Sequence, residues 1–264
     1  MKRGNSPMDV PGVVRSSRDV AGGRRLTLDL EGEREAVPAI LLLPNSASTR
    51  ARAPAALLLH GYTSRKERMA EGIGRSLLTR GVASLAIDLP FHGERKGSLD
   101  QLSFRNPLQL VGAWRLALNE IRLALDYLSD LPAVDAQSLA IVGYSLGSFL
   151  SVVAAANDAL VRVVVLASGG YLPAETPFAS IVRAAADPLR AVRKLAGRPL
   201  LMVNGRLDRT IKPTQAERLF AAAGEPKEIR WYGGGHWPPP SEVDFAADWL
   251  GARVRRGGSA ERRA

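Results

Sequence analysis

Short apolar segments alternate with segments of helical periodicity from about residue 24 to residue 252. The first two, residues 24–32 and 36–44, are close together and predict an antiparallel pair of strands. Six more read as nearly continuous apolar runs, which are typical of parallel strands covered on both faces. These six are residues 55–60, 82–88, 138–143, 161–167, 199–205 and 227–233.

Segments with the spacing of amphipathic helices fill the intervals between these strands. They are residues 64–81, 104–130, 146–157, 213–223 and 241–252. Ser64 and Glu67 have the spacing of a capping box, which predicts that the first of these helices begins there. Residues 168–198 interrupt the alternation with three prolines and predict short helices inserted as a small cap. The whole pattern predicts a single α/β domain with an eight-stranded, mostly parallel sheet covered by helices on both faces.

The net charge of +10 is concentrated at the two ends of the chain. Residues 1–25 hold six Lys or Arg against two Asp, and residues 251–264 hold five Arg against one Glu. We therefore expect a basic, flexible N-terminal segment over residues 1–23, the α/β domain over residues 24–252, and a basic, flexible tail over residues 253–264. No basic stretch is interleaved with aromatic residues, so we expect no specific nucleic-acid partner.

Composition excludes several other classes of protein. The 264 residues contain no cysteine, which rules out disulfides, thiolate metal sites and a cysteine nucleophile. No segment approaches eighteen uninterrupted apolar residues, and no apolar run of a signal peptide follows the N-terminal charges. We expect a cytoplasmic protein without a membrane span.

One short motif carries the candidate chemistry. Gly-Tyr-Ser-Leu-Gly, residues 143–147, stands where a predicted strand gives way to a predicted helix. A sharp turn at that point requires small neighbours, which Gly143 and Gly147 supply, and it lifts the hydroxyl of Ser145 out of the sheet. The start of the following helix favours developing negative charge. Ser145 is therefore the candidate nucleophile of an acyl-transfer reaction.

A serine hydroxyl needs a base, and the base needs an orienting acid. In hydrolases with this strand-turn-helix motif the residues follow in the order Ser, acid, His. His236 is the only one of three histidines after Ser145, and it lies in a glycine-rich loop after the last predicted strand. Asp208 follows a predicted strand and is the favoured acid, with Asp187 in the cap as the alternative. The expected oxyanion donors are the backbone N–H groups of Leu146 and of Tyr62, in the loop after the third strand.

Five segments together resemble the α/β-hydrolases, specifically the branch of dienelactone hydrolases and acetyl esterases. They are HGYTSRKE (60–67), DLPFHGER (88–95), GYSLG (143–147), NGRLDRTIKP (204–213) and GGGHW (233–237). The resemblance implies Ser145 as nucleophile, His236 as general acid and base, Asp208 as its orienter, and an oxyanion hole at Tyr62 and Leu146. Dienelactone hydrolases use a cysteine nucleophile, so the absence of cysteine favours the esterase side of the branch.

The sequence thus predicts a serine carboxylesterase that hydrolyses small to medium carboxylic esters through an acyl-serine intermediate and needs no cofactor. The alternatives are a thioesterase or peptidase of the same fold, and a hydrolase-fold binding protein that has lost catalysis. Asp88 and His92 could be imagined as metal ligands, but a pair without a third ligand is poor support and we expect no metal. The expected substrate pocket is formed by Tyr171, Leu172, Phe178, Ile181 and Trp237.

Overall fold

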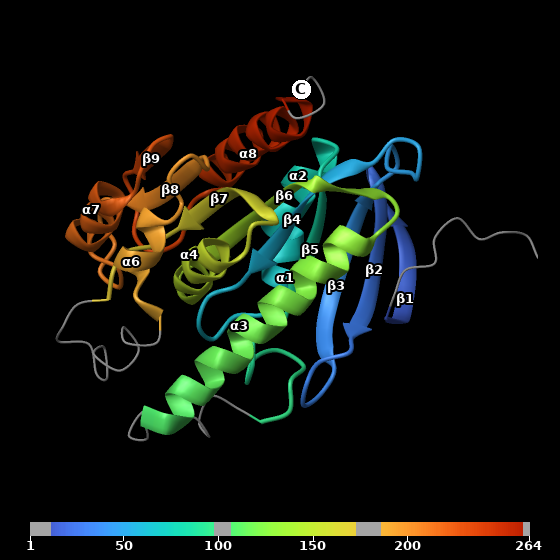
Figure 1. Cartoon of the computed structure of the whole chain (residues 1–264), viewed down its shortest axis with the longest axis horizontal. Coiled ribbons are helices and arrows are strands. Elements are labelled where there is room, and N and C mark those ends of the chain that lie inside the picture. Colours follow the sequence, from blue (N-terminus) through green and yellow to red (C-terminus); the bar gives the residue numbers. More distant parts are fainter. Residues whose placement is uncertain (1–11, 98–106, 173–185, 261–264) are drawn as a thin grey trace, which may run out of the picture.

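A single twisted sheet runs through the molecule in this computed structural model, which describes residues 12–97, 107–172 and 186–260 (Figure 1). Its nine strands are arranged in the order β1-β2-β3-β5-β4-β6-β7-β8-β9. Antiparallel pairing joins β1, β2, β3 and β5, and the pairs from β5 through β4 to β9 are parallel. The strands are β1 (Val13–Val20), β2 (Gly23–Leu30), β3 (Val37–Pro44), β4 (Ala53–Leu59), β5 (Ala83–Ile87), β6 (Val134–Tyr144), β7 (Val161–Ala167), β8 (Leu200–Gly205) and β9 (Lys227–Tyr232).

The eight predicted strands are all present, but the expected count was wrong by one edge strand. Strand β1 lies within the N-terminal segment that we expected to be flexible, and it pairs with β2 from Val13 opposite Asp29 to Val20 opposite Gly23. Seven of its eight side chains are exposed. Its sequence therefore has no apolar pattern, and the strand is held along the sheet edge by backbone pairing with β2 and by ion pairs of Arg15.

Helices cover both faces of the sheet (Figure 1). One face packs against α3, α4, α6 and α7, and the other packs against α1, η1, α2 and α8. Their bounds are α1 (Lys66–Met69), η1 (Ala70–Gly74, π-helical), α2 (Arg75–Thr79), α3 (Pro107–Asp130), α4 (Leu146–Asn157), α6 (Pro188–Arg193), α7 (Pro213–Ala222) and α8 (Pro240–Ala260). No helix in the described parts of the chain is both long and apolar enough to cross a membrane.

The C-terminal tail expected from residue 253 onward is helical through Ala260, so that expectation was also wrong in part. Val254 is fully buried in the core cluster that α8 shares with α1, η1 and α2, so the helix packs against the protein at a position beyond the expected boundary. Most of the stability of a helix in a folded protein comes from the packing of its apolar face, and here that packing includes a residue past the end of the visible periodicity.

The first predicted helix begins later than expected and is interrupted. Arg65 precedes its first residue, and no side chain caps it, so the capping box of Ser64 and Glu67 does not form. The backbone N–H of Lys66 instead donates to the carboxylate of Asp88. The helix is also broken within η1 at Gly72, whose φ of −85° and ψ of −107° are not helical. A tertiary contact thus replaces the local cap.

The predicted cap over residues 168–198 is described only at its two ends. Short helix α6 lies in its second part, as the prolines suggested, and residues 173–185 lie outside the described residues. Because β4, β6, β7 and β8 are parallel, their carboxyl ends meet at one edge of the sheet. The loops after these strands carry the candidate functional residues.

Candidate active site

Ser145 occupies a tight turn between β6 and α4. Its φ of +52° and ψ of −113° lie in a region that side-chain-bearing residues rarely adopt, and it precedes the first residue of α4. A Cβ atom added at Gly143 would lie 2.2 Å from the carbonyl oxygen of Gly147. A Cβ atom at Gly147 would lie 2.3 Å from the carbonyl oxygen of Leu59. Both glycines are therefore required by close backbone contacts around the turn.

The structure brings Ser145, His236 and Asp208 into one line of hydrogen bonds. Nε2 of His236 lies 2.9 Å from Oγ of Ser145, and Nδ1 lies 2.8 Å from Oδ2 of Asp208. The other carboxylate oxygen of Asp208 accepts the backbone N–H groups of Thr210 and Ile211, at 2.8 and 3.0 Å. The Asp208 side chain is fully buried, whereas the imidazole retains 17% exposure. This geometry can transfer a proton from the hydroxyl to the imidazole.

Asp187, the alternative acid, lies elsewhere. Its carboxylate accepts the backbone N–H of Leu189 at 2.9 Å and caps helix α6. It therefore makes a local helix cap, which is a frequent role of aspartate.

Two residues that the sequence analysis did not single out hold the loop of His236. The carbonyl oxygen of His236 accepts hydrogen bonds from Oγ of Ser168 at 2.5 Å and from the hydroxyl of Tyr144 at 3.3 Å. The ring of Tyr144 also lies 5.3 Å from the imidazole, measured between centroids. Tyr144 is the last residue of β6, and Ser168 directly follows β7. Their positions at the carboxyl ends of parallel strands could have identified them from the sequence as residues near the site.

The loop after β4 passes beside Ser145. A Cβ atom added at Gly61 would lie 3.2 Å from Cβ of Ser145 and 2.8 Å from the ring of Tyr144. Tyr62 follows in this loop and is 43% exposed, and Leu146 begins α4 next to Ser145. The structure thus places both candidate oxyanion donors in segments that adjoin Ser145.

His60 is a structural histidine of fixed tautomer. It is fully buried, and Nε2 accepts the backbone N–H of Leu89 at 3.0 Å, so Nδ1 carries the proton that is donated to the carbonyl oxygen of Gly61 at 2.8 Å. Burial lowers the pKa of His60 to about 4. His60 therefore stays neutral near pH 7, and both of its ring nitrogens are already used.

His92 packs against His60 and Tyr62 and is nearly as buried. Its Nδ1 lies 2.8 Å from the carbonyl oxygen of Pro90, and its Nε2 has no hydrogen-bond partner in the part of the chain that the structure describes. Burial lowers the pKa of His92 as well. The carboxylate of Asp88 is directed to Lys66 and to the N–H of Glu94. Within the described ranges, no three His, Cys, Asp or Glu side chains group as metal ligands.

Three of the five expected pocket residues lie among the described residues, and their surroundings differ. Trp237 is 54% exposed, stacks on Tyr144 with 4.6 Å between ring centroids, and lines a cavity of about 560 Å³ between η1 and α8. Tyr171 and Leu172 are half-buried, and the ring of Tyr171 packs under the guanidinium of Arg218 on α7. Phe178 and Ile181 lie outside the described residues.

Comparison with known proteins gives matches of sequence and of fold. A polyketide transferase, ATR5, of Stachybotrys chlorohalonatus is 29% identical over 194 residues, which cover 73% of this chain and 57% of the transferase. The chain thus spans little more than half the length of this curated relative.

Solved structures resemble the fold over most of the chain. A cold-adapted esterase from an Arctic intertidal metagenomic library has a TM-score of 0.71 and 22% identity, over 90% of this chain and 97% of the esterase. Acetyl xylan esterase 1 from Thermoanaerobacterium sp. has a TM-score of 0.73 and 17% identity, over 92% and 88% of the two chains. Est1E from Butyrivibrio proteoclasticus, solved with ferulic acid, has a TM-score of 0.69 and 18% identity, over 86% and 99%. The profile of the alpha/beta hydrolase family matches residues 56–197, and with the fold described above this shows that the chain belongs to the alpha/beta hydrolase family.

Proposed function

We propose that this protein is a serine carboxylesterase that hydrolyses small to medium carboxylic esters through an acyl-serine intermediate. The observation that carries the proposal is the line of hydrogen bonds from Ser145 through His236 to Asp208. The bond class is supported by the fold-level resemblance to enzymes described as esterases, including acetyl xylan esterases.

Acylation begins when Oγ of Ser145 attacks the ester carbonyl and Nε2 of His236 takes the hydroxyl proton. The carbonyl oxygen becomes an oxyanion that the N–H groups of Tyr62 and Leu146 stabilise. The tetrahedral intermediate collapses, His236 gives the proton to the leaving alkoxide oxygen, and the alcohol departs. Asp208 holds the Nδ1–H tautomer and stabilises the imidazolium that forms in each step.

Deacylation repeats these steps with water as nucleophile. His236 takes a proton from water, the hydroxide adds to the acyl-serine carbonyl, and the carboxylic acid leaves as Oγ of Ser145 regains its proton. None of these steps calls for a metal or an organic cofactor. A fall in activity at acid pH follows from the mechanism, because a protonated imidazole cannot accept the serine proton.

The test is hydrolysis of p-nitrophenyl esters from acetate to palmitate by the wild-type protein and by Ser145→Ala. We expect turnover of the shorter chains and a loss of roughly 10⁴-fold or more in kcat on removal of the nucleophile. Ser151→Ala is the matched control, because Ser151 lies on helix α4, which follows Ser145, and its buried hydroxyl has no hydrogen-bond partner within the described chain. More than a tenth of the activity in Ser145→Ala would remove Ser145 from the role of nucleophile.

Two other functions of the same site give different results in these experiments. A folded wild-type protein that cleaves none of these esters but reacts with a fluorophosphonate probe at Ser145 would point to a thioesterase or peptidase. A protein that neither turns over esters nor reacts with the probe would be a binding protein of this fold.

Acyl transfer to an alcohol is the second candidate reaction, because one relative is described as a polyketide transferase. The acyl-serine would then be attacked by an alcohol in place of water, with His236 again as the base. Adding a primary alcohol to the assay and measuring ester against acid product decides between the two acceptors. Predominantly new ester at low alcohol concentration would favour the transferase.

A further inference from the structure

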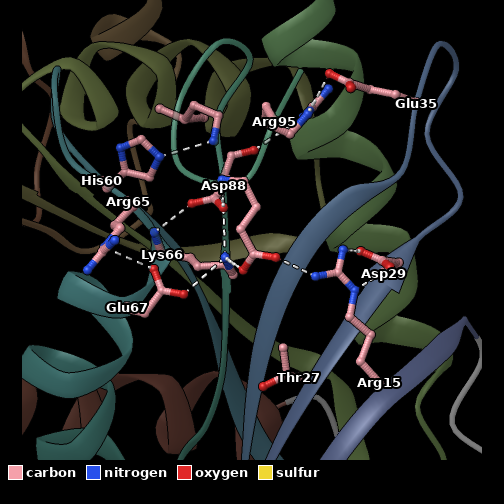
Figure 2. Close-up of polar contacts among 12 residues, drawn as sticks. Arg15, Thr27, Asp29, Glu35, His60, Arg65, Lys66, Glu67, Asp88 and Arg95 are labelled. Carbon is pink, nitrogen blue, oxygen red and sulfur yellow. Dashed lines mark hydrogen bonds and ion pairs between the residues drawn. The ribbon is translucent and has the colours of Figure 1, made fainter. Parts of the chain in front are cut away.

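The loop beside Ser145 is fixed at both of its ends by one neighbouring segment, residues 88–94 (Figure 2). At the start of the loop, the ring of His60 accepts the backbone N–H of Leu89 at 3.0 Å. At the end of the loop, the backbone N–H of Lys66 donates to Oδ1 of Asp88 at 2.8 Å. The five residues between these ties, 61–65, include the proposed oxyanion donor at Tyr62.

The side chain of Lys66 makes a second contact with Asp88, in addition to the contact of its backbone N–H. The ammonium of Lys66 is fully buried and lies 2.8 Å from Oδ2 of Asp88, whose side chain is also fully buried. The same ammonium contacts the carboxylates of Glu67 and Glu94 (Figure 2). Asp88 thus accepts from both the backbone and the side chain of one residue, and its second oxygen also accepts the N–H of Glu94 at 3.0 Å.

The burial of these charges makes the contact hard to displace. Burial alone would lower the pKa of Lys66, but its hydrogen bonds to Asp88 and Glu94 outweigh this effect and raise it. The amine therefore carries its charge, and separating it from Asp88 would leave a charge buried without its partner. Such a contact fixes a backbone position more firmly than an exposed ion pair does.

The network continues outward to the edge of the sheet. Glu94 also pairs with Arg15 on β1, which pairs in turn with Asp29 on β2 (Figure 2). The side chains of Arg15 and Glu94 are 37% and 46% exposed, so this outer pair is in contact with water. The inner pair adjoins the loop and the outer pair does not, which provides a natural control.

We propose that Lys66 and Asp88 are positioning residues that hold the 61–65 loop where the Tyr62 N–H faces the developing oxyanion. This proposal rests on the esterase function proposed above. Neither side chain needs to touch the substrate. Their effect on the rate comes through the placement of one N–H group, and a displacement of about 1 Å at a reacting centre lowers a rate by roughly 100-fold.

The experiment compares Asp88→Asn and Lys66→Met with the wild-type protein and with Arg15→Gln as control. For p-nitrophenyl acetate we expect kcat to fall by about 100-fold in the two inner variants, KM to change by less than about threefold, and Arg15→Gln to match the wild type. The ratio of the activity on an oxygen ester to the activity on its thiono analogue should also fall. Sulfur accepts hydrogen bonds more weakly than oxygen, so displacing the N–H donor slows the oxygen ester more than the thiono ester. Amide hydrogen exchange of residues 61–65 should become faster in the inner variants alone.

Asp88→Asn is the decisive variant if Lys66→Met does not fold, because the asparagine keeps the shape of the side chain and an acceptor for the Lys66 N–H. Inner variants that fold with wild-type kcat, ester-to-thionoester ratio and loop exchange would overturn the positioning role. A wild-type protein without esterase activity would instead overturn the proposed function, and the exchange measurement would still report on the loop.

Discussion

The carboxylate of Asp208 lies 2.8 Å from Nδ1 of His236, although 28 residues separate them in sequence. Its other oxygen is tied to the N–H groups of Thr210 and Ile211, so the oxygen that faces the imidazole has a fixed direction. An ionised carboxylate can only accept, which places the proton on Nδ1 and leaves Nε2 free to accept from Ser145.

Asp208→Asn should therefore nearly abolish turnover. The amide can present an N–H to Nδ1, which favours the opposite tautomer, and we expect kcat to fall by roughly 10⁴-fold with little change in KM. Steady-state kinetics on p-nitrophenyl acetate, with the melting temperature as a check of folding, measures this. Asp187→Asn is the matched control, because Asp187 caps α6 and makes no contact with His236; an equal loss in both variants would contradict the assignment.

Gly147→Ala should destabilise the protein because its Cβ atom would meet backbone atoms. The added carbon would lie 2.3 Å from the carbonyl oxygen of Leu59, a contact that neither segment can relieve without moving. We expect a loss of about 3 kcal/mol or more in the free energy of unfolding, in the range of overpacking and backbone strain. Urea denaturation compares it with Gly112→Ala at an exposed position of helix α3, where nothing lies within 4 Å of the added carbon. The control should gain about 0.5–1 kcal/mol, and a Gly147→Ala protein as stable as the wild type would refute the clash.

The stability of the fold should fall as the pH drops from about 6.5 toward 4. The pKa of His60 is lowered to about 4 in the folded protein by burial, so between these values the unfolded chain binds a proton that the folded chain does not. At 1.36 kcal/mol per pKa unit, this residue lowers the free energy of unfolding by about 3 kcal/mol when the pH reaches 4. His92 contributes in the same direction, because burial lowers its pKa as well.

Urea unfolding at pH 7, 6, 5 and 4.5 measures this loss, and NMR titration of the imidazole C–H signals identifies the residue. Most of the window lies above the usual pKa values of carboxylates, which separates the effect of the histidines from acid denaturation in general. A stability that stays constant from pH 7 to 5, or a His60 ring that titrates near 6.5, would contradict the prediction.

Glu120→Gln on α3 should be far more damaging than Asp126→Asn on the same helix. Glu120 makes two hydrogen bonds of 2.7 Å to Arg95, and the two side chains are 2% and 0% exposed. Removing one partner of a buried pair typically costs about 3–5 kcal/mol. Asp126 pairs with Arg122 at 3.8 Å on the surface, where a pair contributes about 0.5 kcal/mol or less. Equal melting temperatures of the two variants would show that the buried pair contributes nothing.

Much of this architecture can be predicted from local patterns in the sequence. The pattern of apolar residues predicts eight of the nine strands, and the strands covered on both faces, such as β3 and β4, are apolar along nearly their whole length. The two glycines of residues 143–147 mark the tight turn, and the order of residues along the chain selects His236 as the base for Ser145. These features depend on neighbours in sequence, so they can be predicted without the fold.

Other features depend on which distant residues meet. Strand β1 has mostly exposed side chains and is defined by its backbone pairing with β2 and by the ion pairs of Arg15 with Asp29 and Glu94. Lys66 has the local sequence of a solvated helix start, but the fold buries its charge against Asp88. Asp208 and Asp187 are both plausible acids until the loops after β8 and β9 bring one of them to His236. The sequence by itself determined eight of the nine strands and the candidate nucleophile Ser145, because backbone conformation and burial impose local patterns. Only the tertiary structure decided the partners of the buried charges, because pairing across the sheet leaves no periodic trace along the chain.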